Sequence, residues 1–336
     1  MKISIDFQVR KRYHIEYIAL GVENLQLSHS LRLMGTTIDI QINSKNAQKQ
    51  IQEVIEVLEL YKNRFSANDF NSELMAINNN AGIKPIQVHP DLFELITIGK
   101  EHSLARPSNL NIAIGPLVQT WRIGFSDAKL PSPSEISEAM ILSNPTHILL
   151  DSKNQSVFLN QIGMKIDLGA LAKGYIADKI MTYLKNEMID SAIINLGGNV
   201  LVHGDNPNRS EGYWVIGIQH PKKKRGQNIG AVKIKNQSVV TSGTYERRLI
   251  IDDKEYHHIF DRQTGYPIQT EMASISIVSK QSVDCEIWTT RLFGLSIKEA
   301  LDILNAVSYI EGIIITKDDR IYLSDGLKHH FQLFYH

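Results

Sequence analysis

The sequence has little of what several classes of protein depend on. It contains a single cysteine, Cys285, among 336 residues, so no disulfide can form within the chain and a cysteine-based zinc site is excluded. Lys and Arg together number 36, as do Asp and Glu, so the net charge is zero. This balance argues against non-specific nucleic-acid binding and against a polybasic membrane surface. No apolar run approaches the roughly 18 residues that a membrane span needs.

What the sequence does contain is typical of a globular protein. Apolar residues make up 43% and charged residues 21%, which excludes disorder, a collagen-like chain and a coiled coil. Residues 1–7 have neither an apolar signal core nor a cysteine for a lipid anchor. We therefore expect a cytoplasmic protein with no nucleic-acid partner and no membrane insertion, unless a leader has been removed.

The spacing of apolar residues predicts an α+β fold. In residues 47–65 they recur every three or four positions, which predicts a helix with one apolar face. Strands and helices do not alternate regularly, so a doubly wound sheet is not expected. Further helices are expected over 90–104, 136–142, 170–184, 285–295 and 297–307. Strands are expected within 13–42 and at 147–151, 156–159, 193–196, 214–219, 231–234, 273–278 and 312–316.

Two segments rich in small residues could bind a ligand. Residues 166–178 (IDLGALAKGYIAD) pass from an expected strand into a helix, where backbone amides attract anions and Lys173 would add a positive charge. The alternative is a packing corner with Lys173 in solvent, which is the commoner meaning of such a segment alone. In residues 195–199 (NLGGN) the glycines allow contact with a flat ligand or, more simply, a tight hairpin turn.

Hydroxyl groups and histidines follow along the chain. Residues 240–247 (VTSGTYER) come after an expected strand and could bind a polyphosphate or a ribityl chain, or form an ordinary turn. His257 and His258 project to opposite faces of an extended chain, so only one can face a given site. A histidine in a polar cleft is a candidate general base near neutral pH, whereas a lone histidine is more often structural.

Residues 283–292 (VDCEIWTTRL) contain a possible metal site. Glu286 and Thr290 are four residues apart and share a face of the expected helix. A carboxylate and a hydroxyl, with phosphate oxygens completing the shell, suit Mg²⁺. Asp284 would lie on another face if the helix begins before it. Taken alone, these acids are better explained by their favourable position at the start of a helix.

Taken in order, these segments resemble the ApbE-type FAD:protein FMN transferases. A single GG or TSG means little, but nine segments in the family's order, from about residue 31 to the final third, form a specific pattern. The matching segments are 34–36, 72–78, 115–121, 167–178, 195–198, 214–221, 241–247, 258–267 and 286–290.

The resemblance implies both a fold and an activity. The fold is a single α+β unit over residues 31–336, with mixed or antiparallel sheets flanked by helices and an FAD cleft between two lobes. Residues 1–30 would form an N-terminal extension. The activity is Mg²⁺-dependent transfer of FMN from FAD to a Ser or Thr hydroxyl of an acceptor flavoprotein, with release of AMP.

The resemblance also implies roles for individual residues. By position, His258 is the candidate base and also contacts FAD. The metal ligands would be Glu286, Thr290, the backbone carbonyl of Ala170, and Thr289. The other residues expected to line the FAD site are Met34, Asn109, Leu110, Asn111, Asp167, Lys173, Thr241, Ser242 and Gly243.

Three departures from the family pattern affect these expectations. The family usually has Asp where Glu286 stands, so the carboxylate here lies one methylene further out. The competing register, with Asp284 as the ligand, would place Trp288 at the position of the threonine. Residue 111 is Asn rather than the frequent Asp, and Ile112 and Ala113 replace the usual Pro-Thr. Two other functions are therefore kept open: hydrolysis of FAD to FMN and AMP, and FAD binding with weakened catalysis.

Overall fold

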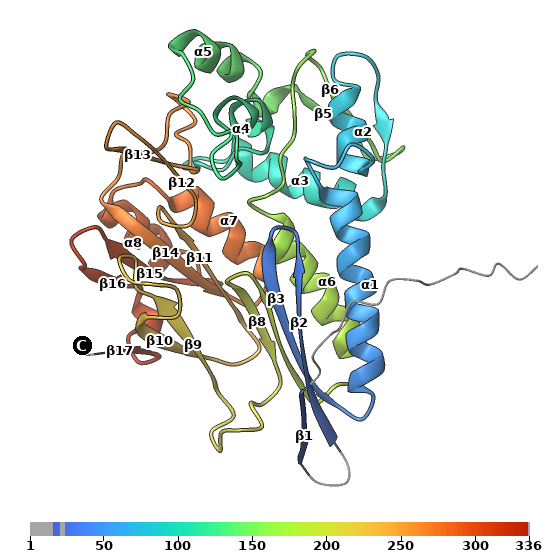
Figure 1. The fold of residues 1–336 in the computed structure, drawn as a ribbon, viewed down its shortest axis with the longest axis vertical. Helices are drawn as coiled ribbons and strands as arrows, with labels where there is room; N and C mark the ends of the chain where they lie inside the picture. Colours follow the sequence, from blue (N-terminus) through green and yellow to red (C-terminus); the bar gives the residue numbers. More distant parts are fainter. Residues whose placement is uncertain (1–15, 21–23, 335–336) are drawn as a thin grey trace, which may run out of the picture.

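The largest element of the protein is a nine-stranded antiparallel sheet (Figure 1). The computed structural model describes residues 16–20 and 24–334. The strands follow the order β1-β2-β3-β7-β8-β11-β14-β15-β16. They are β1 (Glu16–Leu20), β2 (Asn24–Leu33), β3 (Thr36–Ser44), β7 (Ser191–Leu196), β8 (Asn199–His203), β11 (Ser238–Gly243), β14 (Met272–Ser279), β15 (Ile310–Thr316) and β16 (Ile321–Leu323).

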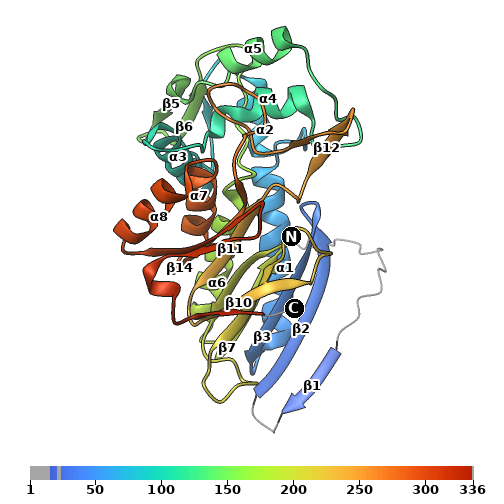
Figure 2. The same cartoon turned by 90° about the vertical axis from the view of Figure 1, so that its left-hand side faces the viewer.

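Helices pack on one face of this sheet and a small second sheet packs on the other (Figures 1 and 2). The helices are α1 (Ala47–Phe65), α6 (Ala172–Asn186), α7 (Ser282–Leu292) and α8 (Ile297–Ala306). The second sheet has the order β17-β10-β9. Its strands are β9 (Trp214–Gln219), β10 (Asn228–Ile234) and β17 (Phe331–Leu333), and the short helix η3 (Asp325–Leu327) precedes β17.

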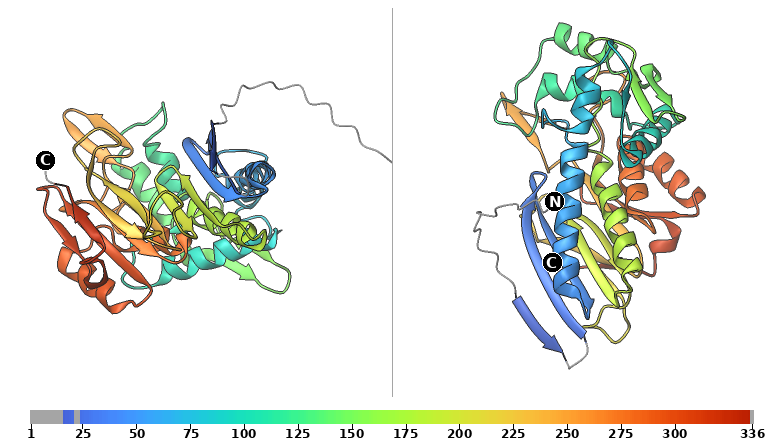
Figure 3. Two further views of the ribbon diagram at one scale, coloured as in Figure 1. Left: turned by 90° about the horizontal axis from the view of Figure 1, so that it is seen from below. Right: turned by 90° about the vertical axis from the view of Figure 1, so that its right-hand side faces the viewer.

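Alternating apolar residues explain how the first of these layers forms. Ile38, Ile40 and Ile42 of β3 are all buried, while the residues between them are polar. On α1 the buried positions include Val54 and Leu58, which lie on one face of the helix. Figure 3 shows α1, in blue, running along the blue strands β2 and β3.

A second group of elements lies at the top of Figure 1. Trp121 is fully buried there and joins α4 and α5 to the hairpin β12–β13. The first part of the group belongs to the main core, because Leu74, Ile77 and Leu92 are in the same buried cluster as the sheet. The group comprises α2 (Glu73–Asn79), β4 (Ile86–Gln87), α3 (Pro90–Leu104), η1 (Ile112–Ile114), α4 (Gly115–Trp121), α5 (Pro133–Ile141), η2 (Pro145–His147), β5 (Ile148–Asp151), β6 (Ser156–Leu159), β12 (Arg248–Ile251) and β13 (Lys254–His257).

The predicted elements are confirmed in type, and their ends differ by up to three residues. The helix expected at 285–295 begins at Ser282, and the one expected at 170–184 begins at Ala172. Two expectations were wrong: no strand precedes α6 at residues 164–168, and Thr241, Ser242 and Gly243 lie within β11 rather than after it. The pattern also missed the short elements α2, α4, β4, β8, β12, β13, β16 and β17.

The N-terminal region is described only in part. Residues 1–15 and 21–23, which belong to the expected extension over residues 1–30, lie outside the described residues. Strand β2 runs across the expected boundary at residue 30, so the boundary stays a prediction. Among the described residues, no helix has both the length and the apolar character that crossing a membrane requires.

Candidate active site

The start of α7 is held by a carboxylate from α6. Asp178 accepts hydrogen bonds from the backbone amides of Ser282 and Val283, both at 2.8 Å. These amides have no partner within their own helix, so the distant Asp178 caps it. Because α7 begins before Asp284, the side chains of Asp284 and Glu286 lie on different faces of the helix.

Glu286 is buried and held in place by a chain of hydrogen bonds. Its side chain is 6% exposed, and Asn199 Nδ2 donates to its Oε1 at 3.0 Å. Asn199 Oδ1 in turn accepts from the Ser282 hydroxyl at 2.7 Å, and Ser238 donates to Ser282 at 2.9 Å. The orientation of this carboxylate is therefore fixed by residues from β8, β11 and α7.

Lys173 faces the same carboxylate from the first turn of α6. Its ammonium nitrogen lies 3.6 Å from Glu286 Oε1. The two helices approach closely at Gly174, where a Cβ atom would lie 2.6 Å from the Ser282 carbonyl oxygen and 2.8 Å from Glu286 Cγ. Glycine at this position is what lets Lys173 and Glu286 meet.

Three oxygen donors near this point are suitable for a divalent cation. The Thr290 hydroxyl and the Ala170 carbonyl accept no hydrogen bond from the described residues, and Glu286 uses only Oε1 there. Thr289 differs, because it is fully buried and donates to the Glu286 carbonyl at 3.0 Å. Carboxylate, carbonyl and hydroxyl oxygens are the ligands that Mg²⁺ prefers. Within the described ranges no three His, Cys, Asp or Glu side chains cluster as a metal site.

Of the two adjacent histidines, only His258 is available for chemistry. Both ring nitrogens of His257 are used within the fold, by the Ile268 carbonyl at 2.9 Å and the Ile259 amide at 3.2 Å. His258 Nδ1 lies 3.4 Å from the Arg247 carbonyl. This contact favours the tautomer in which Nδ1 carries the proton and Nε2 can accept one.

The environment of His258 keeps its imidazole neutral. Burial first, and then the positive charge of Arg247, lower the pKa of His258 to about 4, and Lys173 contributes in the same direction. Lys173 therefore acts electrostatically on His258 and also forms an ion pair with Glu286. A neutral imidazole at pH 7 is the form that a general base requires.

Asp167 lies in the turn before α6, and its backbone pairs with the segment around residue 111. Its amide donates to the Ile112 carbonyl at 2.9 Å, and its Oδ1 accepts from the Gly169 amide at 2.7 Å. Burial raises the pKa of Asp167, which the Gly169 hydrogen bond and the Arg247 charge oppose. Asp167 is therefore linked electrostatically to the surroundings of His258.

Residues 109–111 border the same region, with unequal roles for their side chains. Asn109 donates to the Phe260 carbonyl at 3.0 Å, which ties it to the segment just after His258. Leu110 is 1% exposed and belongs to the core. Asn111 caps η1, because its Oδ1 accepts from the Ala113 amide while its Nδ2 donates to Ser143.

The remaining predicted residues lie on the sheet. Met34 occupies the two-residue turn between β2 and β3 with φ of 49°, and Thr36 after it touches the β7–β8 turn. A Cβ on Gly197, whose φ is 68°, would lie 2.1 Å from Thr36 Oγ1, so only glycine fits. The residues 195–199 thus form the expected hairpin turn, which ends at Asn199.

Thr241, on β11, is engaged within the sheet, because its hydroxyl bonds to Ser276 at 2.7 Å.

The structure therefore brings His258, Asp167, Lys173 and Glu286 near one another from three segments. Leu110, Asn111 and Thr289 have buried or structural side chains. In the described part of the chain, no hydrogen bond or ion pair joins Met34, Thr241, Ser242 or Gly243 to the group. Sequence reasoning missed the roles of Asn199 and Asp178. Asp178 lies in the matched segment 167–178, and Asn199 directly follows the matched segment 195–198.

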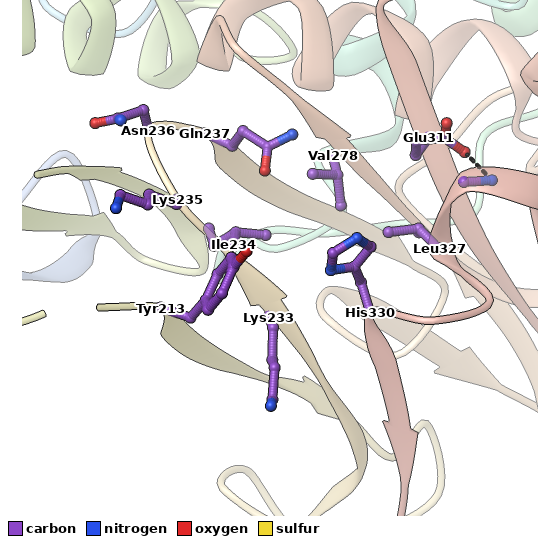
Figure 4. A pocket seen from close by; sticks show the side chains of 11 residues that line it. Tyr213, Lys233, Ile234, Lys235, Asn236, Gln237, Val278, Glu311, Leu327 and His330 are labelled. Atoms are coloured by element: carbon purple, nitrogen blue, oxygen red, sulfur yellow. Dashed lines mark hydrogen bonds between the residues drawn. The ribbon is translucent and has the colours of Figure 1, made fainter. Parts of the chain in front are cut away.

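A separate cavity of about 430 Å³ lies beside the small sheet (Figure 4). Tyr213 and His330 are among the residues that line it, and their rings are in tilted contact with centroids 6.5 Å apart. None of the predicted site residues is among those that line it. It is therefore distinct from the region around His258.

Comparison with known proteins identifies the family. The family model described as "ApbE family" matches residues 34–314. The chain is 40% identical over 302 residues to the FAD:protein FMN transferase of Klebsiella pneumoniae, covering 90% of this chain and 93% of that protein. It is 32% identical over 319 residues to the Treponema pallidum protein of the same name, covering 90% and 88%.

Solved structures agree with this assignment. The crystal structure of the ApbE protein from Thermotoga maritima superposes with a TM-score of 0.81 at 26% identity, covering 90% of this chain and 98% of that one. The flavinyl transferase ApbE from Pseudomonas stutzeri gives a TM-score of 0.80 at 20% identity, covering 94% and 99%, and supports the fold alone. The predicted α+β architecture is confirmed, and this chain belongs to the ApbE family.

Proposed function

We propose that this protein is an FAD:protein FMN transferase, which moves FMN from FAD onto a Ser or Thr hydroxyl of an acceptor protein and releases AMP. One observation carries the proposal: three side chains from different segments lie close together. They are the neutral His258 just after β13, Lys173 on α6 and Glu286 on α7. The names of the relatives, matched over 90% of the chain, support the same activity.

The reaction is a displacement at phosphorus. The acceptor oxygen forms a bond to the phosphorus on the riboflavin side of FAD, and the bond from that phosphorus to the bridging oxygen breaks. The bridging oxygen leaves with AMP. The hydroxyl proton passes first to a base and then to solvent, so atoms and charge balance.

His258 is the residue we assign to that proton transfer. Its Nε2 is the nitrogen left to accept a proton, since Nδ1 faces the Arg247 carbonyl. A base that is neutral at pH 7 takes the proton as the oxygen–phosphorus bond forms, which is typically worth 10²–10⁴-fold in rate. Asp167 and Lys173 would position FAD, with Asn109 at the border of the same region.

The residues present fit a bound Mg²⁺. Glu286, Thr290 and the carbonyl of Ala170 would hold it, and Thr289 stays a weaker candidate because its hydroxyl is already engaged. When bound, the ion would neutralise charge on the diphosphate of FAD. Asn199 and Ser282 hold Glu286 for this purpose, which favours Glu286 over Asp284 as the carboxylate ligand.

The test uses purified protein, FAD, Mg²⁺ and an acceptor flavoprotein with a Ser or Thr flavinylation motif. We expect a covalent FMN adduct by intact mass, one AMP per adduct, and no adduct on an acceptor whose hydroxyl residue is replaced by Ala. AMP and FMN released at the full rate without acceptor would instead indicate a hydrolase. FAD that stays intact with Mg²⁺ and acceptor present would indicate a binding protein.

A further inference from the structure

Arg247 lies beside the candidate base, and its guanidinium has no hydrogen-bond or ion-pair partner in the part of the chain that the structure describes. It immediately precedes β12, and its carbonyl is the oxygen that faces His258 Nδ1 at 3.4 Å. Its side chain passes over Gly124, where a Cβ atom would lie 2.9 Å from Arg247 Cδ. The loop after α4 therefore leaves room for this arginine because residue 124 is glycine.

Two other arginines near the site are used differently. Arg262 donates to the Ser103 and Ser108 carbonyls at 2.8 and 3.1 Å, and Arg291 donates to the Pro107 carbonyl at 3.1 Å. Both hold the backbone before residue 109 in place. Arg247 is exposed instead, and its charge reaches both His258 and Asp167. It is positioned to bind an anion from outside the fold.

We propose that Arg247 is a further catalytic residue, whose guanidinium binds the nonbridging oxygens of the FAD phosphate under attack. This role rests on the proposed function. A base must lie about 3 Å from the attacking hydroxyl, and that oxygen about 3–3.5 Å from the phosphorus. The phosphate is then within reach of a long side chain that begins next to the base. A guanidinium presents two parallel N–H groups that match two phosphate oxygens.

Arg247 would act in two ways during the reaction. Its charge offsets the negative charge on the phosphate as the new oxygen–phosphorus bond forms and the bond to the AMP oxygen breaks. It transfers no proton. It also disfavours the imidazolium form of His258, whose other charged or titratable neighbours are His257 and Lys173. Loss of the arginine charge therefore moves the protonation of His258 to higher pH.

The test compares Arg247→Gln with Arg248→Gln in the full-length protein. Arg248 is the neighbouring exposed arginine, and its guanidinium is already engaged in an ion pair with Glu255 at 3.1 Å. We expect Arg247→Gln to lower kcat for FMN transfer roughly 10²–10³-fold and to shift the acidic limb of the pH profile upward. Arg248→Gln should retain wild-type kcat and pH profile. Arg247→Lys should recover part of the lost rate.

The outcomes separate this role from the proposed function. If the wild-type protein transfers FMN and Arg247→Gln does so at the same kcat, the catalytic role of Arg247 is wrong. A rise in the KM for FAD with kcat unchanged also overturns it, because the arginine then only binds substrate. If Arg247→Gln unfolds, the second variant is Arg247→Ala, assayed with added guanidinium ion in place of the missing side chain. If guanidinium ion restores none of the lost rate, the proposal is contradicted. A wild-type protein that never forms an FMN adduct refutes the proposed function itself.

Discussion

Replacing Asn199 by alanine tests whether the buried hydrogen-bond chain behind Glu286 serves the metal site. Asn199 is fully buried on β8 and makes two hydrogen bonds, to Glu286 Oε1 at 3.0 Å and to Ser282 Oγ at 2.7 Å. Alanine removes both and leaves no group in their place. Glu286 is then restrained by its contact with Lys173 at 3.6 Å.

The size of the effect follows from these contacts. A hydrogen bond to a charged group contributes about 1.5–3 kcal/mol and a neutral one about 0.5–1.5 kcal/mol. Because the two bonds share one side chain and are not independent, we expect Asn199→Ala to lower the free energy of unfolding by about 2–4 kcal/mol. Loss of a group that orients a metal ligand typically costs 10–100-fold in metal affinity, so the Mg²⁺ needed for half-maximal transfer should rise by roughly that factor.

The assay is a Mg²⁺ titration of FMN transfer at saturating FAD, beside thermal unfolding without metal. Asn160→Ala serves as the matched control, since Asn160 is exposed on the turn after β6 and should change neither quantity. An Asn199→Ala protein that is destabilised as expected but keeps the wild-type Mg²⁺ requirement would refute the reasoning. The hydrogen-bond chain would then stabilise the fold without serving the site.

Further predictions concern the two helices and the base. Gly174→Ala should destabilise the protein by about 1–3 kcal/mol and raise the Mg²⁺ requirement, because its Cβ would collide with the Ser282 carbonyl; an unchanged melting temperature contradicts this. His258→Ala should retain FAD binding, measured by flavin fluorescence, but transfer FMN roughly 10²–10⁴-fold more slowly; a wild-type rate excludes it as the base. Since the pKa of His258 is lowered to about 4, the imidazole is half protonated at that pH and mostly neutral above it. The kcat/KM of the wild type should therefore fall only as pH drops through about 4, and a limb near 6.5 would contradict the structure. Glu286→Gln should abolish transfer at Mg²⁺ concentrations that saturate the wild type while Glu286→Asp retains it; equal rates for all three proteins would exclude a metal role.

Local structure was predictable wherever neighbouring residues decide it. The apolar stripe of α1 appears where the spacing of apolar residues predicted it. The start of a helix was less predictable where its capping residue lies far away along the chain. Nothing near Ser282 indicates that α7 begins there, because the cap is Asp178, more than a hundred residues away along the chain.

Short elements were missed for a related reason. Strand β8 has five residues, too few for a period to show, and it forms because it pairs with β7 across the Gly197–Gly198 turn. The end of β11, residues 241–243, was expected to follow a strand rather than belong to one, because Thr, Ser and Gly are typical of turns. In the sheet the Thr241 hydroxyl instead bonds to Ser276 on the neighbouring strand β14.

The candidate site was predictable as a set of segments but not as a geometry. Family resemblance selected His258, Lys173 and Glu286, while the contacts that make them one group cross between β8, α6, α7 and the β12–β13 hairpin. Those contacts depend on close approaches that sequence patterns do not encode, such as the glycine of α6 against α7. It follows that substitutions at Gly174 or Asn199, neither of which was predicted as a site residue, should affect metal use, because they set the distance and orientation of Glu286 rather than its chemistry.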